Sequence, residues 1–201
     1  MLLHAVLCVW NEEDIIESTV RHAFAQGCTR VYLVDNGSTD ATVSRGTACG
    51  AQPAASFHTD VFDEVRKIMH INATIEAMNR QSDEDSQWWL IVDADEFPDI
   101  DGPGRIIDFL RAAPPDIRAV HGVLHDHIPT HPPHHSRLRH PADTMPLARK
   151  TSTGKVPLLR FTTGANRTFF RRGRALVSGR GRRDSRAARR ADYPSLPLSG
   201  L

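Results

Sequence analysis

Residues 88–97 have the sequence WWLIVDADEF, in which five apolar residues run directly into a segment with three carboxylates. The apolar run is short and bounded, which predicts a buried strand rather than a helix. Side chains two positions apart in a strand lie on the same side, so Asp93 and Asp95 should lie together at its carboxyl end. Neighbouring carboxylates at the edge of an apolar core suit a divalent cation, but aspartates also suit a surface turn. Spacing alone leaves both alternatives open.

The sequence around this stretch alternates between predicted strands and predicted helices. The predicted strands before it are residues 5–10, 31–34 and 54–57, and a predicted helix follows each of them. After it, a helix is expected between Pro103 and Pro114, and a strand at residues 118–124. Such alternation is typical of βαβ units, so we predict an α/β domain with a mostly parallel central sheet.

The helix ends carry their own signals. Asn11, with Asp14 three residues later, is expected to cap the first helix, and Gly27 to end it. The second helix is expected at residues 39–48, with Ser38 to Asp40 as its cap, and the third at residues 65–80. The Asn36-Gly37 pair also suits a tight turn.

Composition separates the C-terminal end from the rest of the chain. The 201 residues carry a net charge of +1 and are 40% hydrophobic, which suits one globular domain. Residues 171–201 hold nine basic and two acidic residues among many small ones, which predicts a disordered, arginine-rich tail. We therefore expect a domain at residues 1–170. Within it, residues 125–157 are predicted to form a long loop, because they lack aromatic residues and contain many prolines.

The cysteines and the apolar segments indicate where in the cell the protein is expected. The three cysteines have neither metal nor disulfide spacing, which favours a reducing cytosol. No run approaches the ~20 apolar residues of a membrane span. The expected location is cytoplasmic, with a peripheral association with a membrane left open.

Three polar turns follow three of the predicted strands. They are NEED at residues 11–14, DNGSTD at residues 35–40 and DADEF at residues 93–97. Ligands of open α/β sheets bind outside the carboxyl ends of the strands, so these turns should meet in one crevice. An acidic crevice with a divalent cation suits a diphosphate, because the metal neutralises the phosphate oxygens.

In this order, the three motifs resemble those of the glycosyltransferase family 2-like group, which has the Rossmann-like, three-layer GT-A fold. The resemblance covers about residues 3–110 and is loose over residues 111–170. It implies a metal-dependent enzyme that moves a sugar from a nucleotide-diphosphate sugar, expected to be a UDP-sugar, to a carbohydrate, lipid or protein acceptor. A nucleotide-sugar-binding protein with impaired catalysis on the same fold is the alternative.

The resemblance also implies roles for individual residues. The substrate-binding residues that it implies are Asn11, Glu12, Asp35, Asn36 and Asp93. Mn²⁺ or Mg²⁺ would be held against the diphosphate by Asp93 and Asp95, with Asp95 as the principal ligand.

The pattern weakens in the C-terminal half. An inverting transferase needs a base to deprotonate the acceptor hydroxyl, and Asp126 and Asp143 are the candidates. Asn166 stands where related enzymes often have a histidine ligand to the metal, which leaves the coordination incomplete.

Two other features of this half could suggest different ligands. Seven of the 11 histidines lie between His121 and His140. Prolines interrupt them, so an acceptor loop is favoured over a transition-metal site. A nucleic-acid partner is not expected, because residues 171–190 contain no aromatic residues for stacking.

Overall fold

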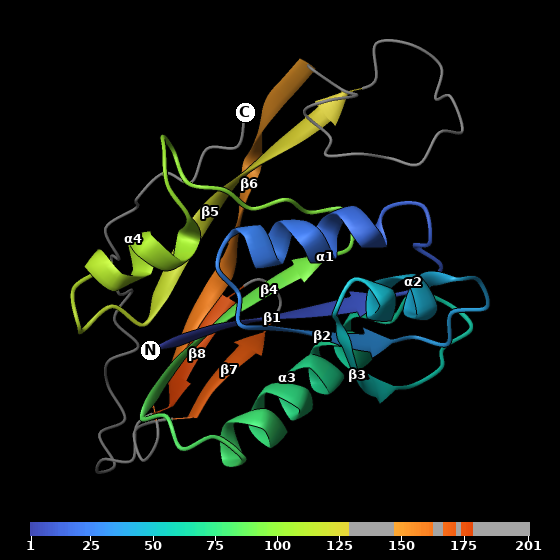
Figure 1. The fold of residues 1–201 in the computed structure, drawn as a ribbon, viewed down its shortest axis with the longest axis horizontal. Helices are drawn as coiled ribbons and strands as arrows, with labels where there is room; N and C mark the ends of the chain where they lie inside the picture. Colours follow the sequence, from blue (N-terminus) through green and yellow to red (C-terminus); the bar gives the residue numbers. More distant parts are fainter. Residues whose placement is uncertain (129–146, 163–166, 172–173, 179–201) are drawn as a thin grey trace.

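The computed structural model describes residues 1–128, 147–162, 167–171 and 174–178 (Figure 1). In chain order its elements are β1 (Leu2–Val9), α1 (Ile16–Ala25), β2 (Arg30–Asp35), α2 (Thr42–Ala48), β3 (Gln52–Ser56), α3 (Glu64–Arg80), β4 (Ser86–Asp93), α4 (Ile106–Ala112), β5 (Ala119–Ile128), β6 (Leu147–Thr162), β7 (Arg167–Arg171) and β8 (Arg174–Ser178). Strands and helices alternate as far as β5, as the periodicity of the sequence predicts.

A six-stranded sheet in the order β3-β2-β1-β4-β6-β5 forms the centre of the fold. β1 pairs in parallel with both β2 and β4, and β3 continues the parallel part beside β2. β6 pairs antiparallel with both β4 and β5, so this side of the sheet is mixed. β7 and β8 form a separate antiparallel pair. The predicted α/β class with a mostly parallel central sheet is confirmed.

Helices cover both faces of the sheet, which gives the domain three layers (Figure 1). One apolar cluster joins alternate strand residues to α1 and α4, and a second joins the intervening strand residues to α3. Trp88 belongs to the first cluster and Trp89 to the second, and each is 1% exposed. β4 is therefore buried on both faces, which explains its continuous apolar sequence. The Trp89 Nε1–H also donates to Asn79 Oδ1 at 3.1 Å, which ties β4 to α3.

The turn after α1 holds the start of α4. Gln26 Oε1 accepts the N–H of Ile106 at 3.0 Å, and the Gln26 carbonyl accepts the N–H of Ile107 at 3.1 Å. Two N–H groups at the start of α4 are thereby satisfied from a distant part of the chain. Gly27 follows with φ +94°, and a Cβ there would lie 2.2 Å from Ile107 Cγ2. Glycine is required at this position both by the backbone conformation and by the close packing.

The first two helices begin later than the sequence predicts. α1 starts at Ile16 and has no side-chain cap. The prediction that Asn11 caps this helix is wrong, because the Asn11 side chain accepts the N–H of Thr39 instead. α2 starts at Thr42, where the Asp40 carboxylate accepts the Thr42 N–H at 2.9 Å.

The predicted loop at residues 125–157 is wrong at both ends. β5 continues to Ile128 and β6 begins at Leu147, and these parts of the two strands pair with each other. β4 pairs only with the last residues of β6, so the outer part of the β5–β6 pair lies beyond the core and needs few apolar residues. The predicted boundary at residue 170 also falls inside β7, and β8 follows it. Residues 129–146 and 179–201 of the predicted loop and tail lie outside the described residues.

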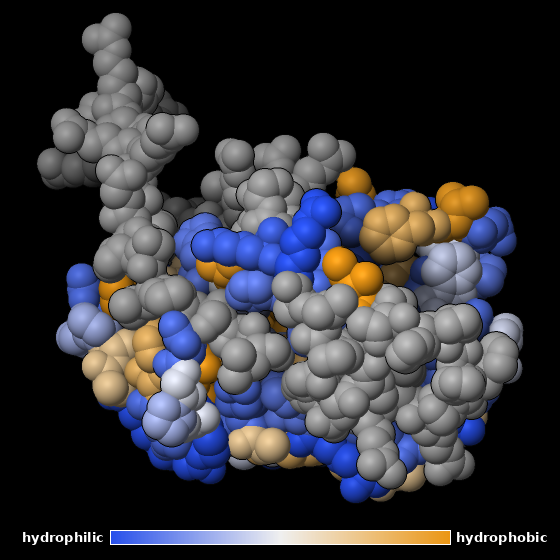
Figure 2. Space-filling view, turned by 90° about the horizontal axis from the view of Figure 1, so that it is seen from above, coloured by the Kyte–Doolittle hydropathy of each residue, from blue (hydrophilic) through white to orange (hydrophobic). Residues whose placement is uncertain are grey.

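The described surface is mainly polar. On the face shown in Figure 2, the coloured area is mostly hydrophilic and apolar residues form small groups. Four exposed apolar side chains, Val61, Phe62, Val65 and Met69, lie in and just before the first turns of α3. None of the helices in the described ranges has the length and apolar character that a membrane span requires.

Candidate functional site

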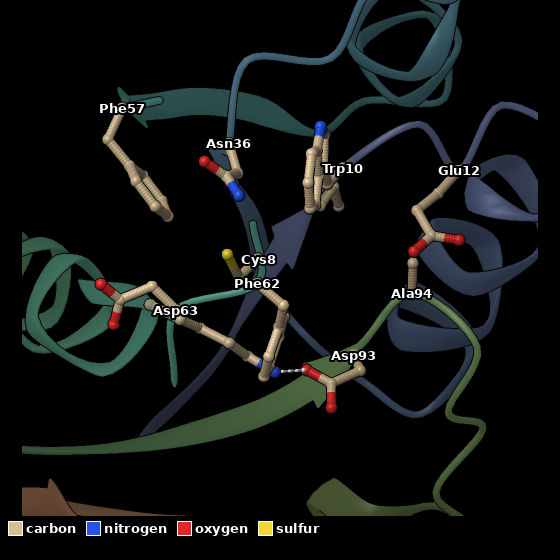
Figure 3. Close-up of a pocket in the computed structure, with 11 residues that line it drawn as sticks. Cys8, Trp10, Glu12, Asn36, Phe57, Phe62, Asp63, Asp93 and Ala94 are labelled. Atoms are coloured by element: carbon tan, nitrogen blue, oxygen red, sulfur yellow. Dashed lines mark ion pairs between the residues drawn. The ribbon is translucent and has the colours of Figure 1, made fainter. Parts of the chain in front are cut away.

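A cleft of about 230 Å³ opens at the carboxyl ends of β1, β2 and β4. β1 contributes Cys8 and Val9 to its wall, and β4 contributes Asp93 (Figure 3). The loop before α3 contributes Phe62, and α3 itself contributes Lys67. The parallel arrangement brings these residues together, because the carboxyl ends of neighbouring strands meet at one edge of the sheet.

The first two polar turns are bonded to each other. Asn11 Oδ1 accepts the N–H of Thr39 at 2.8 Å, and the Asn11 N–H donates to Ser38 Oγ at 3.0 Å. The Glu12 N–H donates to Thr42 Oγ1 at 2.6 Å. Asn11 adopts φ +56°, a left-handed conformation that asparagine tolerates better than most residues. Asn11 therefore joins the two polar turns to each other, whereas Glu12 lines the cleft.

Asp35 and Asn36 follow β2 and differ in their surroundings. Asp35 Oδ1 accepts the N–H of Ser38 at 3.0 Å, which closes a tight turn. Asn36 lines the cleft, is 5% exposed, and its Nδ2–H donates to Thr59 Oγ1 at 2.8 Å. Of these two predicted substrate-binding residues, Asn36 reaches the cleft wall and Asp35 shapes the turn beside it.

Asp93 is paired with two lysines from different elements. Lys67 Nζ of α3 lies 2.6 Å from Asp93 Oδ1, an ion pair that the dashed line in Figure 3 marks. Lys155 Nζ of β6 lies 3.2 Å from Asp93 Oδ2. Burial alone would raise the pKa of Asp93, but the charges of Lys155 and Lys67 outweigh it and bring this pKa below its ordinary value. Asp93 is therefore held in its ionised form.

Glu96 completes this arrangement from within the same turn. Its Oε2 accepts the backbone N–H of Asp93 at 2.9 Å, and Lys155 Nζ donates to the same oxygen. Lys155 thus bridges the Asp93 and Glu96 carboxylates. The bridge fixes the conformation of the polar turn that follows β4.

Asp95 and Glu12 form the acidic side of the site. Asp95 is exposed to solvent, while Glu12 is partly buried in the cleft wall. Burial, followed by the negative charges of Asp95 and Asp14, raises the pKa of Glu12. The carboxylates of Glu12 and Asp95 therefore repel each other electrostatically. A cationic ligand placed between them would relieve this repulsion.

A divalent cation fits this turn if a ligand supplies part of its coordination. Both oxygens of Asp93 are paired with lysines, whereas Asp95 is open. Within the described ranges, no three or more His, Cys, Asp or Glu side chains are grouped so that they could hold a metal ion. Mg²⁺ is commonly bound by one or two carboxylates together with substrate phosphates. The donor set therefore suits a cation shared with a diphosphate rather than a closed protein site.

Aromatic side chains form the part of the cleft wall that lies away from Asp93. In the view of Figure 3, Asn36 stands between Trp10 and Phe57. The Phe57 ring is stacked on His70 with the ring centroids 4.2 Å apart. Phe62 at the rim is largely exposed. Flat apolar faces beside a buried amide are suited to a planar, polar ring such as a nucleobase.

The candidate bases lie outside this cleft wall or outside the described residues. Asp126 is exposed in the outer part of β5, opposite Arg149 of β6. Asp143 and Asn166 lie in ranges that the structure does not describe. Their proposed roles stay predictions.

Two lysines of the site, Lys67 and Lys155, are not among the residues predicted from the sequence. Lys67 was detectable in principle, since it lies at four-residue steps from Ile71 and Ile75 on the buried side of α3. A charged residue in such an apolar stripe requires a partner. Lys155 gave no such signal, because it lies in a segment that was predicted to be a loop.

Comparison with known proteins gives one family match. The sequence model of a family described as "Glycosyl transferase family 2" matches residues 5–174. A search of curated protein sequences found no match.

Several solved structures resemble the chain at a low level. Residues 1–349 of TarS from S. aureus, in complex with UDP-GlcNAc, are 16% identical with a TM-score of 0.38, over 56% of this chain and 30% of that one. Glucosyl-3-phosphoglycerate synthase from M. tuberculosis, in complex with Mn²⁺, UDP and glucosyl-3-phosphoglycerate, is 18% identical with a TM-score of 0.36, over 60% and 43%. A mycobacterial protein is 21% identical with a TM-score of 0.33, over 47% and 31%. The chain spans less than half the length of each, and likeness at this level does not indicate which ligands it binds.

Proposed function

The chain belongs to glycosyl transferase family 2, and from this we propose that it transfers a sugar from a nucleotide-diphosphate sugar, expected to be a UDP-sugar, to an acceptor. One observation carries the proposal. The cleft of about 230 Å³ combines aromatic rings, a buried amide and charged groups at the carboxyl ends of three parallel strands. These are the groups that a base, a ribose and a diphosphate need in one place.

The aromatic side of the cleft is proposed to bind the base and ribose. Trp10 and Phe57 offer ring faces for stacking, and the Asn36 amide can add hydrogen bonds. Asn11 supports this side by bonding the two turns together, and Asp35 supports it by closing the turn that follows β2. A direct contact of either residue with the nucleotide remains part of the proposal.

The acidic side is proposed to bind the diphosphate. Mn²⁺ or Mg²⁺ would be held by Asp95 together with phosphate oxygens, while Asp93, already paired with Lys67 and Lys155, would stand beside the ribose. A divalent cation in this position supplies stabilisation of the negative charge on the leaving diphosphate. The bridge from Lys155 to Glu96 keeps the turn in the conformation that presents Asp95.

The transfer itself exchanges one bond at the sugar. The acceptor oxygen bonds to the anomeric carbon as the bond from that carbon to the diphosphate oxygen breaks. The acceptor proton passes to a base, for which Asp126 and Asp143 are the proposed candidates.

The proposal is tested by titrating the protein with UDP, GDP and dTDP in the presence of Mn²⁺, using isothermal titration calorimetry. Binding of at least one of them is expected, and Asp95→Ala should weaken it by about tenfold through loss of a metal ligand. Asp85→Ala is the matched control, because Asp85 is an exposed aspartate directly before the start of β4, whereas Asp95 follows the end of this strand. Unchanged binding in Asp95→Ala would reject the assigned site. Binding of the nucleotide sugar without hydrolysis or transfer would favour the alternative of a catalytically impaired binding protein.

A further inference from the structure

Two ammonium groups and two carboxylates meet after β4. Lys67 and Lys155 are 16% and 17% exposed, and their partners are Asp93 and Glu96. Because the two positive charges match the two negative ones, this part of the site is electrically balanced before any ligand enters. Buried lysines need such partners, since an unpaired charge is strongly disfavoured away from water.

The two lysines differ in how fully their N–H groups are used. Lys155 Nζ donates to both Asp93 and Glu96, and it is not part of the cleft wall. Among the described residues, Lys67 Nζ forms an ion pair with a single Asp93 oxygen and lies 5.6 Å from the centroid of the Phe62 ring, and the Lys67 side chain lines the cleft. An ammonium has three N–H donors. Lys67, which lines the cleft, therefore has N–H donor capacity left for a ligand.

We propose that Lys67 is a phosphate-binding residue that keeps Asp93 with one N–H and donates another to the diphosphate of the nucleotide, so that a nucleoside diphosphate binds without a divalent cation. This inference rests on the proposed function, because it describes how the same cleft holds the diphosphate of the donor.

The surroundings of Asp93 support this assignment. A divalent cation bound directly to Asp93 would have to displace Lys67 or Lys155, or lie next to an ammonium and be repelled by it. At this point of the cleft, the chain itself therefore supplies an ammonium that can donate to phosphate oxygens. A cation bound through Asp95 would add to the binding of the diphosphate but would not be its sole electrostatic partner.

The experiment uses calorimetric titration of the full chain with UDP, GDP and dTDP, each in EDTA and in Mn²⁺. The wild-type protein is expected to bind one of them in EDTA, within about tenfold of its affinity in Mn²⁺. Lys67→Met should weaken binding in EDTA by about ten- to a hundredfold, because a hydrogen bond to a charged group is lost. Lys67→Arg should retain most of the affinity.

Arg80→Met is the matched control, because it removes a positive charge from an exposed site at the far end of α3. It should bind as the wild type does. Thermal unfolding followed by circular dichroism identifies any variant that fails to fold. If Lys67→Met fails to fold, the affinity of Lys67→Arg in EDTA is compared with that of the wild type instead.

A double-mutant cycle separates direct contact from simple neutralisation of Asp93. If Lys67 donates to the diphosphate, Lys67→Met weakens binding in the Asp93→Asn background as well. Equal affinities of Asp93→Asn with and without Lys67→Met would overturn the proposal, as would wild-type affinity of Lys67→Met in EDTA.

The outcomes also distinguish this inference from the proposed function. Binding in Mn²⁺ but not in EDTA overturns the inference and leaves the proposed function standing. Absence of binding to all three nucleotides in both conditions overturns both.

Discussion

Replacement of Lys155 by methionine should destabilise the domain, and the structure indicates by how much. Methionine keeps most of the apolar length of the side chain and removes the ammonium that bridges Asp93 and Glu96. Within the described part of the chain, Asp93 then keeps only Lys67 as its cationic partner, and the bridge between the two carboxylates is lost.

Breaking a fully buried ion pair costs about 3–5 kcal/mol. Here the side chains are 17% exposed for Lys155, 22% for Glu96 and 34% for Asp93, so water can replace part of the lost interaction. We therefore expect a loss of about 2 kcal/mol in the free energy of unfolding. With a urea m-value of about 2 kcal/mol/M, the midpoint should fall by about 1 M.

The assay is equilibrium unfolding in urea at a series of pH values. The pKa of Asp93 is lowered in the folded protein, so its ion pairs contribute stability at neutral pH. This contribution begins to be lost when the pH falls below 3.8, the ordinary pKa of aspartate. The loss is complete once the pH has fallen through the lowered pKa of Asp93 in the folded protein. The difference between the wild type and Lys155→Met should therefore be full at pH 7 and shrink below about pH 4.

Lys150→Met provides the control, because Lys150 is an exposed lysine on the same strand, β6. It should change the free energy of unfolding by less than about 0.5 kcal/mol. The reasoning is refuted if Lys155→Met unfolds at the wild-type midpoint at pH 7, or if its deficit is the same at pH 7 and pH 3.5.

Two further predictions concern packing and thiol reactivity. Gly27→Ala should cost about 3 kcal/mol, because the new Cβ meets Ile107 Cγ2 at 2.2 Å and φ is +94°. Gly102→Ala has a similar φ of +101° with no atom within 4 Å, and should cost only about 1 kcal/mol. Urea unfolding measures both, and equal losses would contradict the close packing of α4 on this turn. Burial raises the pKa of the Cys8 thiol to about 12, so iodoacetamide at pH 8 should alkylate Cys8 at least about a hundredfold more slowly than glutathione. Peptide mapping by mass spectrometry measures that rate, and rapid alkylation would show that the cleft wall opens at Cys8.

Much of the parallel part of the fold follows from local sequence patterns. The run of apolar residues at Trp88 predicts the core strand β4, and the helical spacing at residues 65–80 matches α3 closely. These signals are local. A strand buried on two faces has a continuous apolar run, and a helix buried on one face has apolar residues at helical spacing, so each element can be predicted from its own residues. The expectation that the polar turns lie near one edge also follows, since parallel strands share the direction of their carboxyl ends.

The antiparallel side of the sheet was less accessible to prediction. The outer parts of β5 and β6 pair with each other beyond β4, so their residues need not be apolar and carry no strand periodicity. Asn11 likewise has the chemistry of a helix cap, but its partner is Thr39 in the next turn. In both cases a contact between distant segments replaces the local one that the sequence suggests.

The sequence by itself determined that carboxylates stand at the end of a buried strand, because apolar runs and turn-forming residues act over a few positions. Only the tertiary structure decided which groups face them. Lys67 reaches Asp93 because α3 packs across the sheet, and Lys155 reaches Asp93 and Glu96 because β6 runs antiparallel beside β4. The charge balance of the site depends on these distant partners, since ion pairing is set by distance in space and not by separation along the chain.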